Sequence, residues 1–332
     1  MDVQIKTAEL SSPAASGEDI TAVKTYAAPR SLAEAVALLR GGNVTILAGS
    51  TDLMPQSKSR ARFQPVLMNV RHIPELSGIG ESDGCVRLGA LTTMTELLDS
   101  AMVKTRFNAL WQAADHFASD QLRNAATIGG NVCNASPAGD TLVPLLVFNA
   151  RVVLASEANG AVTTRTLPLT EFFVGPGRTR RQPTELLTAV EVPMPPAGFV
   201  SEFYKFGTRP ALDIAAIAIG LGAMRDGNRL RDVRVAFGAV APTPIRAPKT
   251  EAALEGKPLA TAIELALAAA DADIHPISDI RASEWYRREL VRNILRRMLN
   301  HVGNYGHRLQ AQRHRCERQG LAKHEHARHA SR

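Results

Sequence analysis

The chain has 332 residues, of which 45% are apolar and 21% are charged, and its formal net charge is +7. This length suits two domains, or one large domain with an appendage, and the composition is that of a globular chain, not a disordered one. No apolar run approaches the ~20 residues of a membrane-spanning helix, and the N-terminus lacks the regions of a secretory signal. The three cysteines, Cys85, Cys133 and Cys316, are too few for a disulfide framework, so we expect a cytoplasmic setting.

Most of the net positive charge lies at the C-terminal end. Residues 303–332 contain seven Lys or Arg residues and two acidic residues, so the rest of the chain is nearly neutral. We expect residues 303–332 to be a disordered His/Arg-rich tail and residues 1–21 to be a loose extension. The alternative for the tail is an arm that docks on an acidic partner subunit. Tyr305 is the tail's one aromatic residue, so nucleic-acid binding is not expected.

Residues 22–195 alternate between short helices and strands. Ser31 to Glu34 matches a capping box ahead of a helix that Gly41 and Gly42 end. A β-branched strand at 44–48 then leads directly into Gly49-Ser-Thr-Asp52, and Thr93 to Glu96 gives a second capping box. Further strands are predicted at 66–70, 86–91, 151–155, 161–167 and 186–192, and helices at 107–117 and 141–148.

The proline-rich segment 193–198 is the best candidate for a linker. Beyond it, three strands of an antiparallel meander are predicted at 203–206, 214–224 and 233–240, with a hairpin turn at Asp226-Gly-Asn228. Two helices follow, one at 261–270 and one capped by Ser283.

Two glycine-containing segments, Gly49–Asp52 and Thr127–Asn131, are the best candidates for a ligand site. Backbone amides free of side-chain bulk can converge on phosphate oxygens. Neither segment is a P-loop or a Rossmann fingerprint, and each alone is typical of an ordinary turn, but the two together favour a shared site. No nucleophile elbow, zinc-protease helix or Cys–His pair is present. We therefore expect a chain that binds a cofactor and lets the cofactor do the chemistry.

Longer motifs around these segments resemble a known family. Ile46-Leu-Ala-Gly-Ser-Thr-Asp-Leu53 and Ala125-Ala-Thr-Ile-Gly-Gly-Asn-Val-Cys-Asn-Ala-Ser-Pro-Ala-Gly-Asp140 are similar to the two flavin pyrophosphate loops of the FAD-binding (medium) subunit of molybdenum hydroxylases. This group includes xanthine dehydrogenase, carbon monoxide dehydrogenase and aldehyde oxidoreductase. The resemblance runs in order along residues 22–300, with further matches at Gly175-Pro-Gly-Arg-Thr179, Glu185-Leu-Leu187, Tyr204-Lys-Phe-Gly207, Asp213-Ile-Ala215, Gly238-Ala-Val-Ala-Pro-Thr-Pro244 and Asp279-Ile-Arg-Ala-Ser283.

The resemblance implies an α+β fold. Residues 22–195 would form a two-subdomain FAD-binding domain of the vanillyl-alcohol oxidase and p-cresol methylhydroxylase type, divided into roughly 22–75 and 76–195. Residues 199–300 would form a C-terminal flavoprotein domain, an antiparallel sheet with helices.

The resemblance also implies cofactor-binding residues, all of them for non-covalent FAD. The first loop would wrap the diphosphate with backbone amides, and the second would close on it, with the Thr127 hydroxyl as a donor. The residues of the two loops are Ile46, Leu47, Ala48, Gly49, Ser50, Thr51, Asp52 and Leu53, then Thr127, Ile128, Gly129, Gly130 and Asn131. The first loop departs from the family pattern, because Ser50 stands where a second glycine is usual.

Five further residues are implied outside the loops. Phe117 would pack near the adenine or ribose, or else be a core residue of its helix. Asp140 would accept a hydrogen bond from a ribose or ribityl hydroxyl, or else lie at a helix start. Leu187 would pack against the isoalloxazine. Lys205 would approach the flavin's pyrimidine edge, or else face solvent, and Asp213 would lie near the flavin edge. The resemblance implies no catalytic residue and no metal ligand on this chain.

The implied function is electron transfer within a multi-subunit molybdenum hydroxylase. Partner chains, a small 2Fe–2S subunit and a large molybdopterin subunit, would form a heterotrimer or its dimer with this chain. Electrons would pass from the clusters through FAD to NAD⁺, a quinone or dioxygen, with no nucleic acid and no membrane span involved. Two alternatives stay open: a free-standing flavin oxidase of the same fold, and a flavin-free assembly subunit, for which Ser50 is the one hint.

Overall fold

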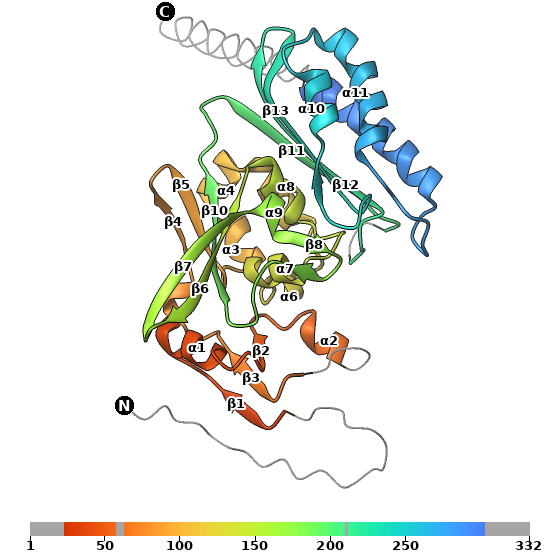
Figure 1. Cartoon of the computed structure of the whole chain (residues 1–332). Helices are drawn as coiled ribbons and strands as arrows, with labels where there is room; N and C mark the ends of the chain where they lie inside the picture. Colours follow the sequence, from red (N-terminus) through yellow and green to blue (C-terminus); the bar gives the residue numbers. More distant parts are fainter. Residues whose placement is uncertain (1–22, 58–62, 210–211, 303–332) are drawn as a thin grey trace, which may run out of the picture.

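The computed structural model describes residues 23–57, 63–209 and 212–302 (Figure 1). The predicted extension at 1–21 and the predicted tail at 303–332 lie outside the described residues. Three larger β-sheets follow one another from the bottom to the top of Figure 1, with helices packed on each.

The first sheet is small and parallel. It has the strand order β1 (Thr25–Ala27), β3 (Val66–Asn69), β2 (Val44–Leu47), and α2 (Leu53–Ser57) follows β2. Helix α1 (Leu32–Leu39) begins as predicted, because the Ser31 side chain accepts the Glu34 amide at 3.2 Å. The Glu34 carboxylate, however, accepts the Arg30 amide instead of the Ser31 amide, so only half of the predicted capping box forms.

The second sheet is antiparallel throughout and lies in the middle of the molecule. Its strand order is β4 (Ile79–Ser82), β5 (Cys85–Gly89), β10 (Leu186–Pro193), β6 (Arg151–Ala158), β7 (Ala161–Pro168). The short helix η1 (Pro74–Leu76) precedes it, and β8 (Phe173–Gly175) pairs with β9 (Arg178–Thr179).

Short helices fill the space beside this sheet. Thr93 and Glu96 form the complete capping box that the sequence predicts at the start of α3. The helix predicted at 107–117 is shorter, because α5 ends at Asp115 and Phe117 lies beyond it. The helices are α3 (Met94–Asp99), α4 (Ala101–Arg106), α5 (Asn108–Asp115), α6 (Asp120–Arg123), α7 (Ile128–Asn134), α8 (Leu142–Val147) and α9 (Leu169–Phe172).

The third sheet is antiparallel, in the order β11 (Phe199–Phe206), β12 (Ile217–Asp226), β13 (Arg229–Gly238), β14 (Ile245–Arg246). Gly227, at φ +59°, makes the predicted hairpin turn. The meander thus has a fourth, two-residue strand that the sequence does not predict. Helices α10 (Pro248–Leu254), α11 (Leu259–Asp273) and a last helix over 284–302 cover it, and α10 is also unpredicted.

Helix α8 packs directly on this third sheet. All six of its residues are buried. Gly220 and Gly238 allow the close approach, because a Cβ on either would come within 2.8 Å of the Val147 or Val143 side chain. The glycines of β12 and β13 therefore allow a close apolar contact between the part of the chain that forms the second sheet and the part that forms the third.

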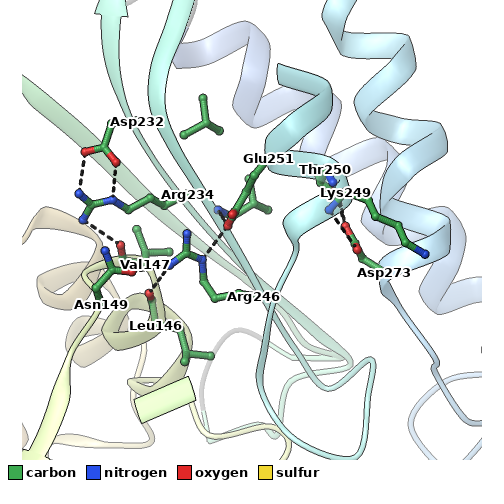
Figure 2. Close-up of polar contacts among 12 residues, drawn as sticks. Leu146, Val147, Asn149, Asp232, Arg234, Arg246, Lys249, Thr250, Glu251 and Asp273 are labelled. Atoms are coloured by element: carbon green, nitrogen blue, oxygen red, sulfur yellow. Dashed lines mark hydrogen bonds and ion pairs between the residues drawn. The ribbon is translucent and has the colours of Figure 1, made fainter. Parts of the chain in front are cut away.

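Two arginines of the third sheet reinforce the contact at the end of α8 (Figure 2). Arg246 donates from Nη1 to the Leu146 carbonyl at 3.2 Å, and Arg234 donates from Nη1 to the Val147 carbonyl at 3.4 Å. Each arginine is also paired with a carboxylate, Glu251 or Asp232, at 2.6 Å. The arginines thus donate to carbonyls in the last turn of α8, where a helix has fewer backbone amides to offer its carbonyls.

Candidate cofactor site

A cavity of about 670 Å³ is lined by strands of the first and second sheets and by the loop before β12. Its wall is formed by β2 and the loop after it, by α7 and the segment up to Asp140, by the start of β10 and by residues 212–214. A volume of this size is typical of a pocket for a small molecule or cofactor. The predicted residues that line it are Ile46, Ala48, Gly49, Ser50, Thr51, Asp52, Leu53, Phe117, Thr127, Gly129, Gly130, Asn131, Asp140 and Leu187, together with Asp213.

Three predicted residues do not line the cavity. Leu47 lies in β2, and its carbonyl accepts the Val70 amide at 3.0 Å. Ile128 is fully buried in the core beneath α7. Lys205 lies behind the wall on β11, where its ammonium group donates to Asp140 Oδ2 at 2.7 Å and to the His116 carbonyl at 3.3 Å.

The loop after β2, residues 49–53, offers free hydrogen-bond donors to the cavity. Among the described residues, none of the five backbone amides of this loop donates a hydrogen bond. Ser50 has φ +62°, in the left-handed region that favours glycine. Consecutive amides without internal partners form a site for an anion, provided that the backbone holds them on one side of the chain.

The second predicted glycine loop is not a loop. Residues 128–131 form the first turn of α7, and Thr127 caps it by accepting the Gly130 amide at 3.1 Å. The other amides of this turn are also taken: those of Ile128 and Gly129 donate to the carbonyls of Thr92 and Ala90, at 2.8 and 2.9 Å. The Asn131 amide donates to the Thr127 carbonyl at 3.0 Å. The turn therefore presents its surface to the cavity but no free backbone donor.

The two segments meet without a side chain between them. A Cβ on Gly49 would lie 2.0 Å from the Ala125 carbonyl oxygen, which no real structure accommodates without a backbone shift. Gly49 is therefore required by the close approach of the two chains, and it fixes the loop at 49–53 against the entry to α7.

Asp140 is the buried carboxylate among the described residues that line the cavity. Its Oδ2 is paired with Lys205, but its Oδ1 is buried without a hydrogen-bond partner among the described residues. Burial raises the pKa of Asp140 to about 6, and the Lys205 charge opposes that increase. Since unpaired buried acceptors are costly, Oδ1 is a site at which a ligand N–H or O–H would be stabilised.

Asp213 organises the loop that brings the third sheet to the cavity. Its carboxylate accepts hydrogen bonds from the Thr208 amide and hydroxyl, the Arg209 amide and the Ile214 amide. Burial raises the pKa of Asp213, but these hydrogen bonds outweigh it and hold the pKa below its ordinary value.

Some residues of the wall were missed by sequence reasoning. Arg181 follows the Gly175–Thr179 motif by two residues, and Leu212 and Ile214 flank Asp213. Arg181 carried no signal of its own, because it stands beside two other arginines, Arg178 and Arg180. Leu212 and Ile214 are apolar residues about half exposed, which a single sequence does not distinguish from surface residues.

The wall thus combines backbone amides that make no hydrogen bond with a buried carboxylate oxygen that has no partner, and both kinds of group are complementary to an anionic, hydroxyl-bearing ligand. Comparison with known families agrees. Residues 20–195 match the family described as the FAD binding domain in molybdopterin dehydrogenase. Residues 202–302 match the carbon monoxide dehydrogenase flavoprotein C-terminal domain.

Individual relatives match along nearly their whole length. The chain is 31% identical over 280 residues to a xanthine dehydrogenase FAD-binding subunit from Escherichia coli, covering 83% of this chain and 94% of the relative. It is 34% identical over 270 residues to a glyceraldehyde dehydrogenase medium chain from Sulfolobus acidocaldarius, covering 81% and 94%. The solved structure of a carbon monoxide dehydrogenase from Hydrogenophaga pseudoflava superposes with a TM-score of 0.78 at 33% identity, covering 83% and 95%.

The chain belongs to the family of FAD-binding medium subunits of molybdenum hydroxylases. It is thus an oxidoreductase subunit, with the α+β FAD-binding fold followed by a C-terminal flavoprotein domain. Within the described ranges, no helix is both long and apolar enough to cross a membrane.

Proposed function

We propose that this chain binds FAD in the cavity and transfers electrons within a multi-subunit molybdenum hydroxylase. The observation that carries the proposal is that one cavity is lined both by residues 49–53, whose backbone amides make no hydrogen bond, and by Asp140, whose buried Oδ1 has no partner among the described residues. An FAD molecule carries both chemical groups that this wall lacks, a diphosphate to accept from amides and sugar-alcohol hydroxyls to donate to a carboxylate.

The residues present fit FAD, and each would have a definite task. The amides of residues 49–53 would hold the diphosphate, with Gly49 keeping that loop against the start of α7. Asp140 Oδ1 would accept a hydroxyl hydrogen, while Lys205 keeps the carboxylate charged. Leu187, Phe117, Leu212 and Ile214 would exclude water from the apolar parts. Bound FAD supplies one- and two-electron redox chemistry that no side chain can supply.

The proposal places substrate oxidation on a partner chain. A large subunit would hold the molybdopterin, and a small subunit would hold two 2Fe–2S clusters that deliver electrons to this chain. Relatives named as medium chains of carbon monoxide and glyceraldehyde dehydrogenases support such an assembly, a heterotrimer or its dimer. The acceptor would be NAD⁺, a quinone or dioxygen, and the cytoplasm would be the compartment.

The test is purification of the tagged chain from its native source, followed by measurement of molybdenum, iron and FAD. We expect all three in one complex. In a complex carrying Gly49→Ala, substrate should still reduce the iron–sulfur clusters, but turnover with an acceptor should be lost. Gly41→Ala is the matched control, because nothing lies within 4 Å of a Cβ at that glycine. A chain that purifies alone and oxidises a substrate by itself would overturn the proposal in favour of a free-standing oxidase.

A further inference from the structure

The cavity wall contains one cation among the described residues that line it, and that cation is Arg181. The charged residues beside it in the lining are three acids, Asp52, Asp140 and Asp213. FAD carries a negatively charged diphosphate, and its flavin ring gains negative charge on reduction. The cavity therefore has to hold a negatively charged cofactor with a single positive side chain in its own wall.

The Arg181 guanidinium is anchored on one side and free on the other. Its Nη1 donates to the carbonyls of Gln182 and Glu185, at 3.1 and 2.7 Å. Among the described residues, neither Nη2 nor Nε has an acceptor, and no carboxylate lies within ion-pair distance. The anchor fixes the direction of a planar group that has donors left to use.

Neighbouring charges do not neutralise Arg181. The nearest carboxylate in its segment belongs to Glu185, which is paired with Arg165 through Nε at 2.5 Å and Nη2 at 2.8 Å and also accepts the Gln182 amide. The Glu185 carboxylate is thus already paired with Arg165, and Arg181 has no ion-pair partner among the described residues. The charge of Arg181 also acts on the Cys133 thiol, which lines the cavity. Burial raises the pKa of this thiol, and the positive charge of Arg181 opposes the increase.

We propose that Arg181 is a cofactor-binding residue that stabilises a negatively charged group of bound FAD through its free guanidinium nitrogens. This inference rests on the proposed function, because it needs FAD in the cavity. Two groups of FAD share the required chemistry, the diphosphate and the reduced flavin ring. A charge-assisted hydrogen bond to either would be lost when the charge is removed.

The test compares Arg181→Gln with Arg180→Gln in the full chain. Arg180 is exposed and does not line the cavity, so the control removes the same charge one residue away. The measured quantities are the Kd values for FAD, ADP and riboflavin, the dependence of the FAD Kd on salt, and the reduction potential of bound flavin. Arg181→Lys keeps the charge and should recover part of any loss.

If Arg181 contacts the diphosphate, Arg181→Gln should weaken FAD and ADP binding about tenfold, reduce the salt dependence and leave riboflavin binding unchanged. If Arg181 contacts the reduced ring, the Kd of oxidised FAD should be unchanged in Arg181→Gln. The reduction potential of bound flavin should then fall by about 30 mV for each tenfold loss of affinity for reduced FAD. Equal values for Arg181→Gln and Arg180→Gln in every measurement would overturn the inference. Wild-type chain that binds no FAD would instead overturn the proposed function.

Discussion

The two glycine-containing segments of the cavity wall, residues 49–53 and 127–131, are opposite in what they offer a ligand. The loop at 49–53 has five backbone amides without acceptors in the described chain, whereas the amides of 128–131 are all used within the protein. The second segment leads instead to Asp140, whose Oδ1 is an acceptor without a donor. We therefore expect the loop at 49–53 to be the anion site of the cavity and Asp140 to be its hydroxyl site.

The largest effect is expected for Gly49→Ala. A Cβ at 2.0 Å from the Ala125 carbonyl oxygen forces the loop to move, which displaces all five amides together. We expect the Kd for FAD to rise at least ~1,000-fold, corresponding to about 4 kcal/mol. Flavin fluorescence quenching measures it, with Gly41→Ala as the control. Binding within threefold of wild type would show that the loop is not the anion site.

A second effect is expected in the pH dependence of stability. The folded-state pKa of Asp140 is about 6, above its ordinary value of 3.8, so the folded chain binds this proton more tightly than the unfolded chain. The free energy of unfolding should therefore fall as pH rises from about 4 to about 6, by at most ~3 kcal/mol from this group, and stay level above that.

Asp140→Asn should remove this contribution to the pH dependence. Urea denaturation of the variant and the wild type between about pH 4 and about pH 6 measures the difference in their free energies of unfolding. Asp83→Asn, at an exposed turn, is the control. Bound FAD should shift the dependence to lower pH, because a hydroxyl donating to Oδ1 favours the charged carboxylate. Parallel profiles for wild type and Asp140→Asn would refute the assignment.

A smaller effect is expected at the start of α7. Thr127→Ala removes the cap on the Gly130 amide, so we expect a loss of about 1 kcal/mol in the free energy of unfolding. The FAD affinity should fall by less than tenfold, since this turn offers no free amide. Thr127→Ser keeps the cap and is the control. A loss of affinity as large as that of Gly49→Ala would mean that α7 itself binds the anion.

The smallest effect is expected for Ser50→Gly, and it is stabilising. Glycine adopts φ +62° without the steric cost that serine has there, so we expect a gain of about 0.5–1 kcal/mol, with FAD affinity kept. Chemical denaturation and FAD titration measure the two quantities. Asp83→Gly, at φ +51° in a turn outside the cavity wall, is the control for a purely conformational gain. Loss of FAD binding would assign the Ser50 hydroxyl to the ligand.

Features set by neighbouring residues could be predicted from the sequence. The Thr93–Glu96 capping box, the turn at Gly227 and the loop after β2 each depend on a few adjacent side chains, and the structure has all three. Helix α10 was missed although Pro248 stands at its first turn, a position that proline favours. The division of the chain at 193–198 stays a prediction.

Features set by distant residues could not be predicted. Two adjacent glycines in 128–131 disfavour a helix, and the turn forms because Ala90 and Thr92, far back in the chain, accept its amides. Lys205 meets Asp140 across 65 residues, and a strand lysine gives no local sign of a buried partner. That Lys205 and Asp140 bind FAD is still a prediction, and so is the same role for the other residues of the cavity wall.

The most direct test of the account is the flavin content of the purified full chain. The protein is precipitated with acid, and the released flavin is identified and measured against protein concentration. We expect a two-band flavin spectrum before precipitation and FAD released in an amount equal to that of the chain. A colourless chain that takes up no added FAD would contradict it, and the flavin-free assembly subunit would then be the better description.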